Sequence, residues 1–169
     1  MIERYIRDVP DFPKPGIVFK DITPLLQDAE GLKASIDQLV EAASAHEFDL
    51  VCGIESRGFI FVTALARQME KGFIPIRKPG KLPWKTAFES YELEYGTDTI
   101  EIHTDAADRN KRVLLVDDLL ATGGTMEAAL KLVDKIGGTP VACLFVIELG
   151  FLDGRSKLGD TPVQSLIRY

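Results

Sequence analysis

Short, continuous apolar runs recur along the chain. The block at residues 113–116 (Val-Leu-Leu-Val) has no polar position, which is typical of a strand buried on both faces. Similar runs predict strands at 48–54, 73–76 and 140–148. Shorter runs predict a strand at 99–103 and a last edge strand at 166–169.

Between these runs, apolar residues recur at helical spacing and predict helices over 28–45, from Gly58 to about Met69, and from Met126 onward. Asp28 is placed to cap the first helix, and Gly137-Gly138 is placed to end the last. Strands that alternate with helices predict an α/β fold, a central, mostly parallel sheet with helices on both faces. Residues 78–98, rich in Gly, Pro and charge, are expected to form a long excursion.

The length of 169 residues fits one domain, 1–169, with a sizeable core. A net charge of -6 argues against a nucleic-acid partner, and no apolar run reaches the length of a membrane span. Cys52 and Cys143 lie in apolar runs and are expected to be inert, buried thiols. A reducing, cytoplasmic location is therefore expected.

Three loops carry charge or glycine and follow predicted strands, at 55–58, 77–82 and 117–125. In a parallel sheet the carboxyl ends of the strands share one rim, where ligands gather. We therefore expect these loops to form one site.

The third loop has the character of an anion cradle. Its small residues open a predicted helix, where backbone N–H groups and the helix dipole favour a phosphate: Ala121, Thr122, Gly123, Gly124 and Thr125. The loop has neither the Lys nor the spacing of a Walker loop. Asp117 and Asp118 precede it and suit the hydroxyls of a ribose, so a sugar phosphate is the predicted ligand.

The other two loops are basic. Arg57, in Glu55-Ser56-Arg57-Gly58, can make a forked contact with a phosphate. A cluster follows the predicted strand at 73–76, with Arg77, Lys78 and Lys81. A solvated charge run is the usual origin of such a cluster, but its place on the rim favours pyrophosphate, which also needs Mg2+.

Two segments have a weaker signal. Phe19, in the apolar triplet 17–19, could stack on a planar base, although the segment could equally be a terminus folded on the core. Residues 91–96 favour an exposed hairpin arm over a lid.

The motifs FPKPGIVFKDITPLL, ESRGF, RKPGKLP, YELEYG and VDDLLATGGT occur here in the order found in the adenine phosphoribosyltransferases, which the sequence resembles over nearly its whole length. The phosphate loop alone indicates the wider type I phosphoribosyltransferase family. The resemblance implies the type I fold, with a small N-terminal hood (1–27) that forms the base pocket and a long mobile loop. It implies purine salvage: adenine and phosphoribosyl pyrophosphate (PRPP) give AMP and pyrophosphate, with Mg2+ held mainly by PRPP and water.

The resemblance also implies roles for particular residues. Residues 121–125 would bind the 5'-phosphate, and Asp117 and Asp118 the ribose. The pyrophosphate would be bound by the four basic residues of the other two loops, some of them across a homodimer interface. Val18, Phe19 and Lys20 would form the adenine pocket, Glu94 would be the acid/base residue, and Tyr95 its neighbour in the lid. No protein ligand to the metal is assigned. The resemblance further predicts a cis peptide at Glu55-Ser56.

Two alternatives share the phosphate loop. One is a phosphoribosyltransferase for guanine, xanthine or orotate. The other is a regulator that binds PRPP without catalysis, although such proteins carry a DNA-binding segment or a basic face that this sequence lacks.

Overall fold

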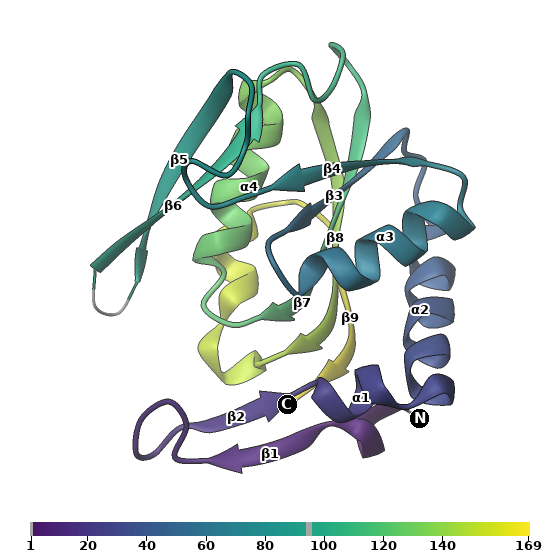
Figure 1. Cartoon of the computed structure of the whole chain (residues 1–169), viewed down its shortest axis with the longest axis vertical. Helices are drawn as coiled ribbons and strands as arrows, with labels where there is room; N and C mark the ends of the chain where they lie inside the picture. The colour runs from purple at the N-terminus through teal and green to yellow at the C-terminus, as the bar shows by residue number, and fades with distance from the viewer. Residues whose placement is uncertain (1, 94–95) are drawn as a thin grey trace. The chain divides into compact units, whose positions relative to one another are not determined.

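The computed structural model describes residues 2–93 and 96–169, and the chain divides into two compact units, Met1–Gln38 and Leu39–Tyr169 (Figure 1). The first unit begins with the 3-10 turn η1 (Ile2–Tyr5) and the antiparallel strands β1 (Arg7–Pro10) and β2 (Val18–Asp21). The short helix α1 (Thr23–Gln27) follows, and α2 (Ala29–Ala43) begins in this unit. Asp28 caps α2 as predicted, because its Oδ1 accepts the Gly31 N–H at 2.8 Å.

The second unit contains a five-stranded sheet with the order β4-β3-β7-β8-β9, in which every neighbouring pair is parallel. Its strands are β3 (Leu50–Ile54), β4 (Gly72–Ile76), β7 (Arg112–Leu120), β8 (Thr139–Glu148) and β9 (Val163–Arg168). The predicted parallel α/β sheet is confirmed, with a last strand at the sheet edge that is longer than expected.

Two crossover helices cover the sheet. Helix α3 (Gly58–Gln68) connects β3 to β4, and α4 (Gly124–Lys135) connects β7 to β8. These two connections step in opposite directions from the central pair β3–β7. Since such crossovers are right-handed, the two helices lie on opposite faces of the sheet (Figure 1).

The predicted excursion over 78–98 needs a correction. Only its first part is irregular; the remainder belongs to an antiparallel hairpin of β5 (Thr86–Leu93) and β6 (Gly96–His103). Tyr91, Ile100 and Ile102 of this hairpin are buried in the same core as Met126 and Leu132 of α4. The hairpin is thus part of the core. The hairpin predicted at 91–96 is confirmed for residues 91–93 and 96, but the expectation that it is exposed is wrong at Tyr91, which is buried.

Two 3-10 turns, η2 (Gly150–Leu152) and η3 (Gly154–Leu158), connect β8 to β9 and were not predicted. Among the residues that the structure describes, no helix is long and apolar enough to cross a membrane. Both cysteines are free and buried, as expected. Burial raises the pKa of both thiols, that of Cys143 to about 12, so they remain protonated and unreactive.

Candidate active site

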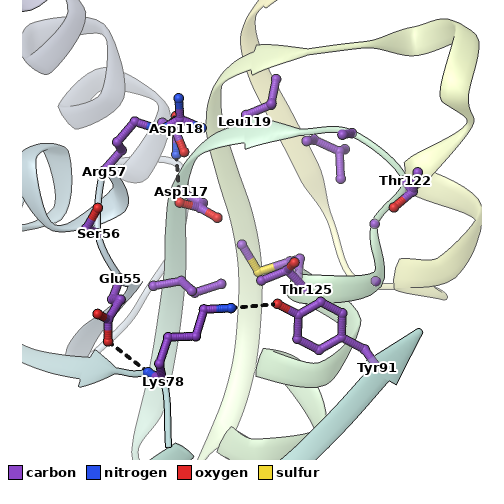
Figure 2. Close-up of a pocket in the computed structure, with 16 residues that line it drawn as sticks. Glu55, Ser56, Arg57, Lys78, Tyr91, Asp117, Asp118, Leu119, Thr122 and Thr125 are labelled. Carbon is purple, nitrogen blue, oxygen red and sulfur yellow. Dashed lines mark hydrogen bonds and ion pairs between the residues drawn. The ribbon is translucent and has the colours of Figure 1, made fainter. Parts of the chain in front are cut away.

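The carboxyl ends of β3 and β7 lie at the point where the chain connections of the sheet diverge. Such a switch point leaves a crevice between the loops that leave the two strands. Here the crevice is a cavity of about 380 Å³. Its lining comes from the turn after β3, from Lys78 and Tyr91, and from the end of β7 through the start of α4: Ile54, Glu55, Ser56, Arg57, Lys78, Tyr91 and residues 117–126 (Figure 2).

The predicted cradle joins β7 to α4. Gly123 has a φ of +84°, a left-handed conformation that glycine adopts without strain, and α4 begins at the next residue. No side chain among the described residues caps this helix, so its first N–H groups are available to a ligand. The cradle therefore has the geometry and the dipole that bind an anion.

Asp117 and Asp118 belong to strand β7 itself, which continues to Leu120, and do not follow the strand as predicted. Asp118 is 6% exposed, and its Oδ2 lies 2.8 Å from Nε of Arg57. The Asp118 N–H donates to Oδ1 of Asp117 at 2.9 Å. A Cβ at Gly58 would lie 2.6 Å from that same oxygen, so glycine is required there for the carboxylate to fit.

Both acids have raised pKa values. Burial raises the pKa of Asp117 well above its usual value, and the charge of Asp118 adds to the rise. Burial also raises the pKa of Asp118, although the guanidinium of Arg57 opposes this effect. Two adjacent carboxyls, of which Asp118 is buried and Asp117 partly buried, are costly in a ligand-free protein, which is typical of a functional site.

Two of the four predicted pyrophosphate residues, Arg57 and Lys78, line the cavity. The Lys78 ammonium pairs with Asp98, and it lies 3.4 Å from the hydroxyl of Tyr91 (Figure 2). Arg77 and Lys81 do not line the cavity; Nε of Arg77 donates to Oε2 of Glu55 at 3.2 Å.

Glu55 organises this side of the cavity, and the sequence did not single it out. Its Oε2 also accepts the Lys78 N–H at 2.8 Å, which ties the turn after β3 to the segment after β4. Burial acts to raise the pKa of Glu55, but the Lys78 N–H and the charge of Arg77 outweigh it, and the net pKa is lowered. The Glu55-Ser56 peptide is cis, as predicted.

Tyr91 and Asp98 were also missed as neighbours of the cavity. Oδ2 of Asp98 accepts the Tyr91 hydroxyl at 3.1 Å, so hairpin residues approach Lys78. The only signal in the sequence was the polar position of Asp98 in a strand that turned out to be longer than predicted.

The predicted adenine residues lie on β2 of the first unit. Val18 is exposed, Phe19 meets Phe12 edge-on with ring centres 5.2 Å apart, and Nζ of Lys20 pairs with Asp8 at 2.7 Å. Glu94 and Tyr95 lie outside the described residues.

Comparisons with known proteins agree with this geometry. The model of the phosphoribosyl transferase domain matches residues 19–162. The adenine phosphoribosyltransferase of Thermotoga petrophila is 52% identical over 168 residues, 99% of each chain. The chain is also similar to the crystal structure of the Thermoanaerobacter pseudethanolicus enzyme, with a TM-score of 0.97 and 52% identity over 99% of this chain and 98% of the other.

A more distant structure is similar as well. Adenine phosphoribosyltransferase from Saccharomyces cerevisiae, solved with an imino-altritol bisphosphate and adenine, has a TM-score of 0.91 and 40% identity, covering 98% of this chain and 96% of that one. These similarities extend over almost the full length of each protein. The chain therefore belongs to the adenine phosphoribosyltransferases of the phosphoribosyltransferase family.

Proposed function

We propose that the cavity binds PRPP and that the protein transfers its ribosyl phosphate to adenine, forming AMP and pyrophosphate. The observation that carries this proposal is the arrangement of three groups at one switch point: an uncapped helix start, the adjacent carboxyls of Asp117 and Asp118, and two cations. A phosphate, a ribose and a pyrophosphate are the parts of PRPP that these groups suit. Membership of the family supports the same reaction.

PRPP would lie along the rim of the sheet. Its 5'-phosphate would accept hydrogen bonds from the backbone N–H groups of residues 121–125, and the ribose hydroxyls would donate hydrogen bonds to the carboxylates of Asp117 and Asp118. The pyrophosphate would lie toward Arg57 and Lys78, with Arg77 and Lys81 beyond the cavity lining. The ribose hydroxyls, and the Mg2+ that accompanies PRPP, would then offset the cost of holding these two carboxyls side by side in the free protein.

The chemistry requires little covalent work from the protein. N9 of adenine attacks the anomeric carbon as pyrophosphate leaves from the opposite face, so positioning and charge stabilisation account for most of the catalysis. In this proposal Val18, Phe19 and Lys20 hold the base, and main-chain groups read its edge. Glu94 exchanges a proton at N7, and Tyr95 is its neighbour.

Mg2+ belongs to this proposal, bound mainly through PRPP and water. Within residues 2–93 and 96–169 no group of three or more His, Cys, Asp or Glu side chains is arranged to hold a metal ion. One or two carboxylates together with substrate phosphates suit Mg2+ better than a closed cage of side chains, and Asp117 and Asp118 fit that pattern. When bound, the ion would neutralise charge on the departing pyrophosphate.

We further propose a cytoplasmic homodimer. The free, buried thiols of Cys52 and Cys143 fit a reducing compartment. Trp84 and Phe88 are 63% and 60% exposed, which is unusual for large apolar side chains and suits a contact surface. Light scattering at micromolar concentration measures the oligomeric state, and a monomer at every concentration would contradict this part.

The direct test is the formation of AMP. The purified protein, with PRPP and Mg2+, is given adenine, hypoxanthine, guanine, xanthine or orotate in separate reactions. We expect a nucleotide and pyrophosphate from adenine alone or by a wide margin. A preference for another base would support a different phosphoribosyltransferase, and binding of PRPP without any product would support a regulator.

A further inference from the structure

The cradle rests on a segment far along the chain, η3. An ideal Cβ at Gly123 would lie 2.3 Å from the carbonyl oxygen of Gly154. An ideal Cβ at Gly154 would lie 2.3 Å from the carbonyl oxygen of Ala121 and 3.1 Å from the Gly123 nitrogen. The two backbones therefore touch with no room for a side chain between them, and the position of η3 determines the position of the cradle.

An ion pair between a buried carboxylate and the more exposed Arg155 holds η3 in place. Glu148, the last residue of β8, has a side chain only 3% exposed. Arg155 of η3 donates from Nε to Oε1 and from Nη2 to Oε2, both at 2.7 Å, which is the two-point contact that fixes a guanidinium most firmly. The Ser165 hydroxyl donates to Oε2 at 2.7 Å, and Nε of Arg168 lies 3.4 Å from Oε1.

The pair lies on one side of the cavity only. Its hydrogen bonds join η3 to the strands β8 and β9, which follow β7 in the sheet order. Arg57 and Lys78 follow β3 and β4, on the other side of β7. A change in the Glu148–Arg155 pair should therefore move the cradle without moving these cations.

We propose that Glu148 and Arg155 are positioning residues for the 5'-phosphate: the pair fixes η3, and the Gly154 backbone fixes the cradle. This inference rests on the proposed function, which places the 5'-phosphate in residues 121–125. It predicts a selective effect. Weakening the pair should weaken binding of ligands that carry a 5'-phosphate and leave pyrophosphate binding unchanged.

Glu148→Gln tests the inference, because it keeps the size of the side chain but places an amide against the Arg155 guanidinium and the Ser165 hydroxyl. Arg155→Lys is the second variant, which keeps the charge and loses the two-point contact. The matched control is Asp49→Asn. Asp49 pairs with Arg112 through two side-chain bonds of 3.2 and 3.3 Å, at the opposite end of β7.

Titration calorimetry with ribose 5-phosphate and, separately, with pyrophosphate and Mg2+ gives the two affinities, and thermal melting reports folding. We expect both variants of the pair to bind ribose 5-phosphate roughly 10- to 100-fold more weakly, since a displacement near 1 Å in a site can cost a factor of that order. Pyrophosphate affinity should stay within about twofold, and the PRPP KM should rise more than the adenine KM. Asp49→Asn should change neither affinity.

Equal losses for both ligands, or affinities in both variants that match the Asp49→Asn control, would overturn the inference. If Glu148→Gln does not fold, Arg155→Lys decides by the same criteria. Failure of the proposed function looks different: the wild-type protein would then make no AMP, whatever the variants bind.

Discussion

Replacing Gly123 by alanine perturbs the cradle through two effects that the structure separates. The first effect is the backbone conformation. At a φ of +84° an alanine is in the left-handed region, which costs about 1–2 kcal/mol. The second effect is contact, because the new methyl group would lie 2.3 Å from the oxygen of Gly154.

The contact effect sets the size of the functional loss. Carbon and oxygen atoms approach to about 3.3 Å in close packing, so the cradle and η3 must separate by about 1 Å. A displacement of that size can lower catalysis about 10²-fold, which corresponds to about 2.7 kcal/mol in the transition state. We expect Gly123→Ala to lower kcat/KM for PRPP by about that factor and to lower the free energy of unfolding by at least the backbone cost.

Gly137→Ala is the matched control. Gly137 follows the far end of α4 and also has a positive φ, +91°, but a Cβ there would meet only Arg109 within 4 Å, at an ordinary contact distance of 3.4 Å. It should lose a similar backbone energy in urea unfolding and keep the wild-type kcat/KM, measured at saturating adenine. If Gly123→Ala keeps kcat/KM within threefold of the wild type, the reasoning about the cradle is refuted.

Three further predictions concern other parts of the site. Asp117→Asn should stabilise the ligand-free protein and weaken PRPP binding. Because burial raises the folded-state pKa of Asp117, ionisation of this carboxyl opposes folding, so the gain in melting temperature should be absent near pH 4 and should grow toward neutral pH. A gain in melting temperature that is independent of pH would contradict this reasoning. Lys20→Arg should keep the preference for adenine in a competition assay with hypoxanthine, since main-chain groups read the base; a shift toward hypoxanthine would implicate the side chain. Glu94→Gln should lower kcat roughly 10²–10⁴-fold with little change in PRPP affinity, whereas Glu92→Gln should stay near wild type, and the reverse result would contradict the assignment of the acid/base role to Glu94.

Much of the site could be predicted because its parts are local in sequence. The apolar block at 113–116, the two acids and the glycine-rich loop form one continuous strand–loop–helix unit, and the rule that ligands bind at the carboxyl ends of parallel strands placed the loop at 55–58 beside it. Lys78 joined the cavity by the same rule. The side chain of Arg77, the preceding residue, instead donates a hydrogen bond to Glu55, and the spacing of residues in the sequence could not predict this difference.

The hairpin was only partly predicted, for a different reason. Residues 86–93 do not alternate cleanly, and the burial that stabilises Tyr91 comes from α4, which lies more than thirty residues away in the chain. The local pattern of apolar residues indicates which side chains are suited to burial, but it does not identify the element that packs against them.

The sequence by itself determined the α/β class, the direction of the strands, the position of the anion loop and the family, since each depends on short periodic patterns or contiguous motifs. The tertiary structure decided the strand order, the pairing of Asp118 with Arg57 and the support of Gly123 by Gly154. It also buried Glu148 between residues of η3 and β9. These contacts join residues distant in the chain, and they exist only because the packed core brings their backbones together.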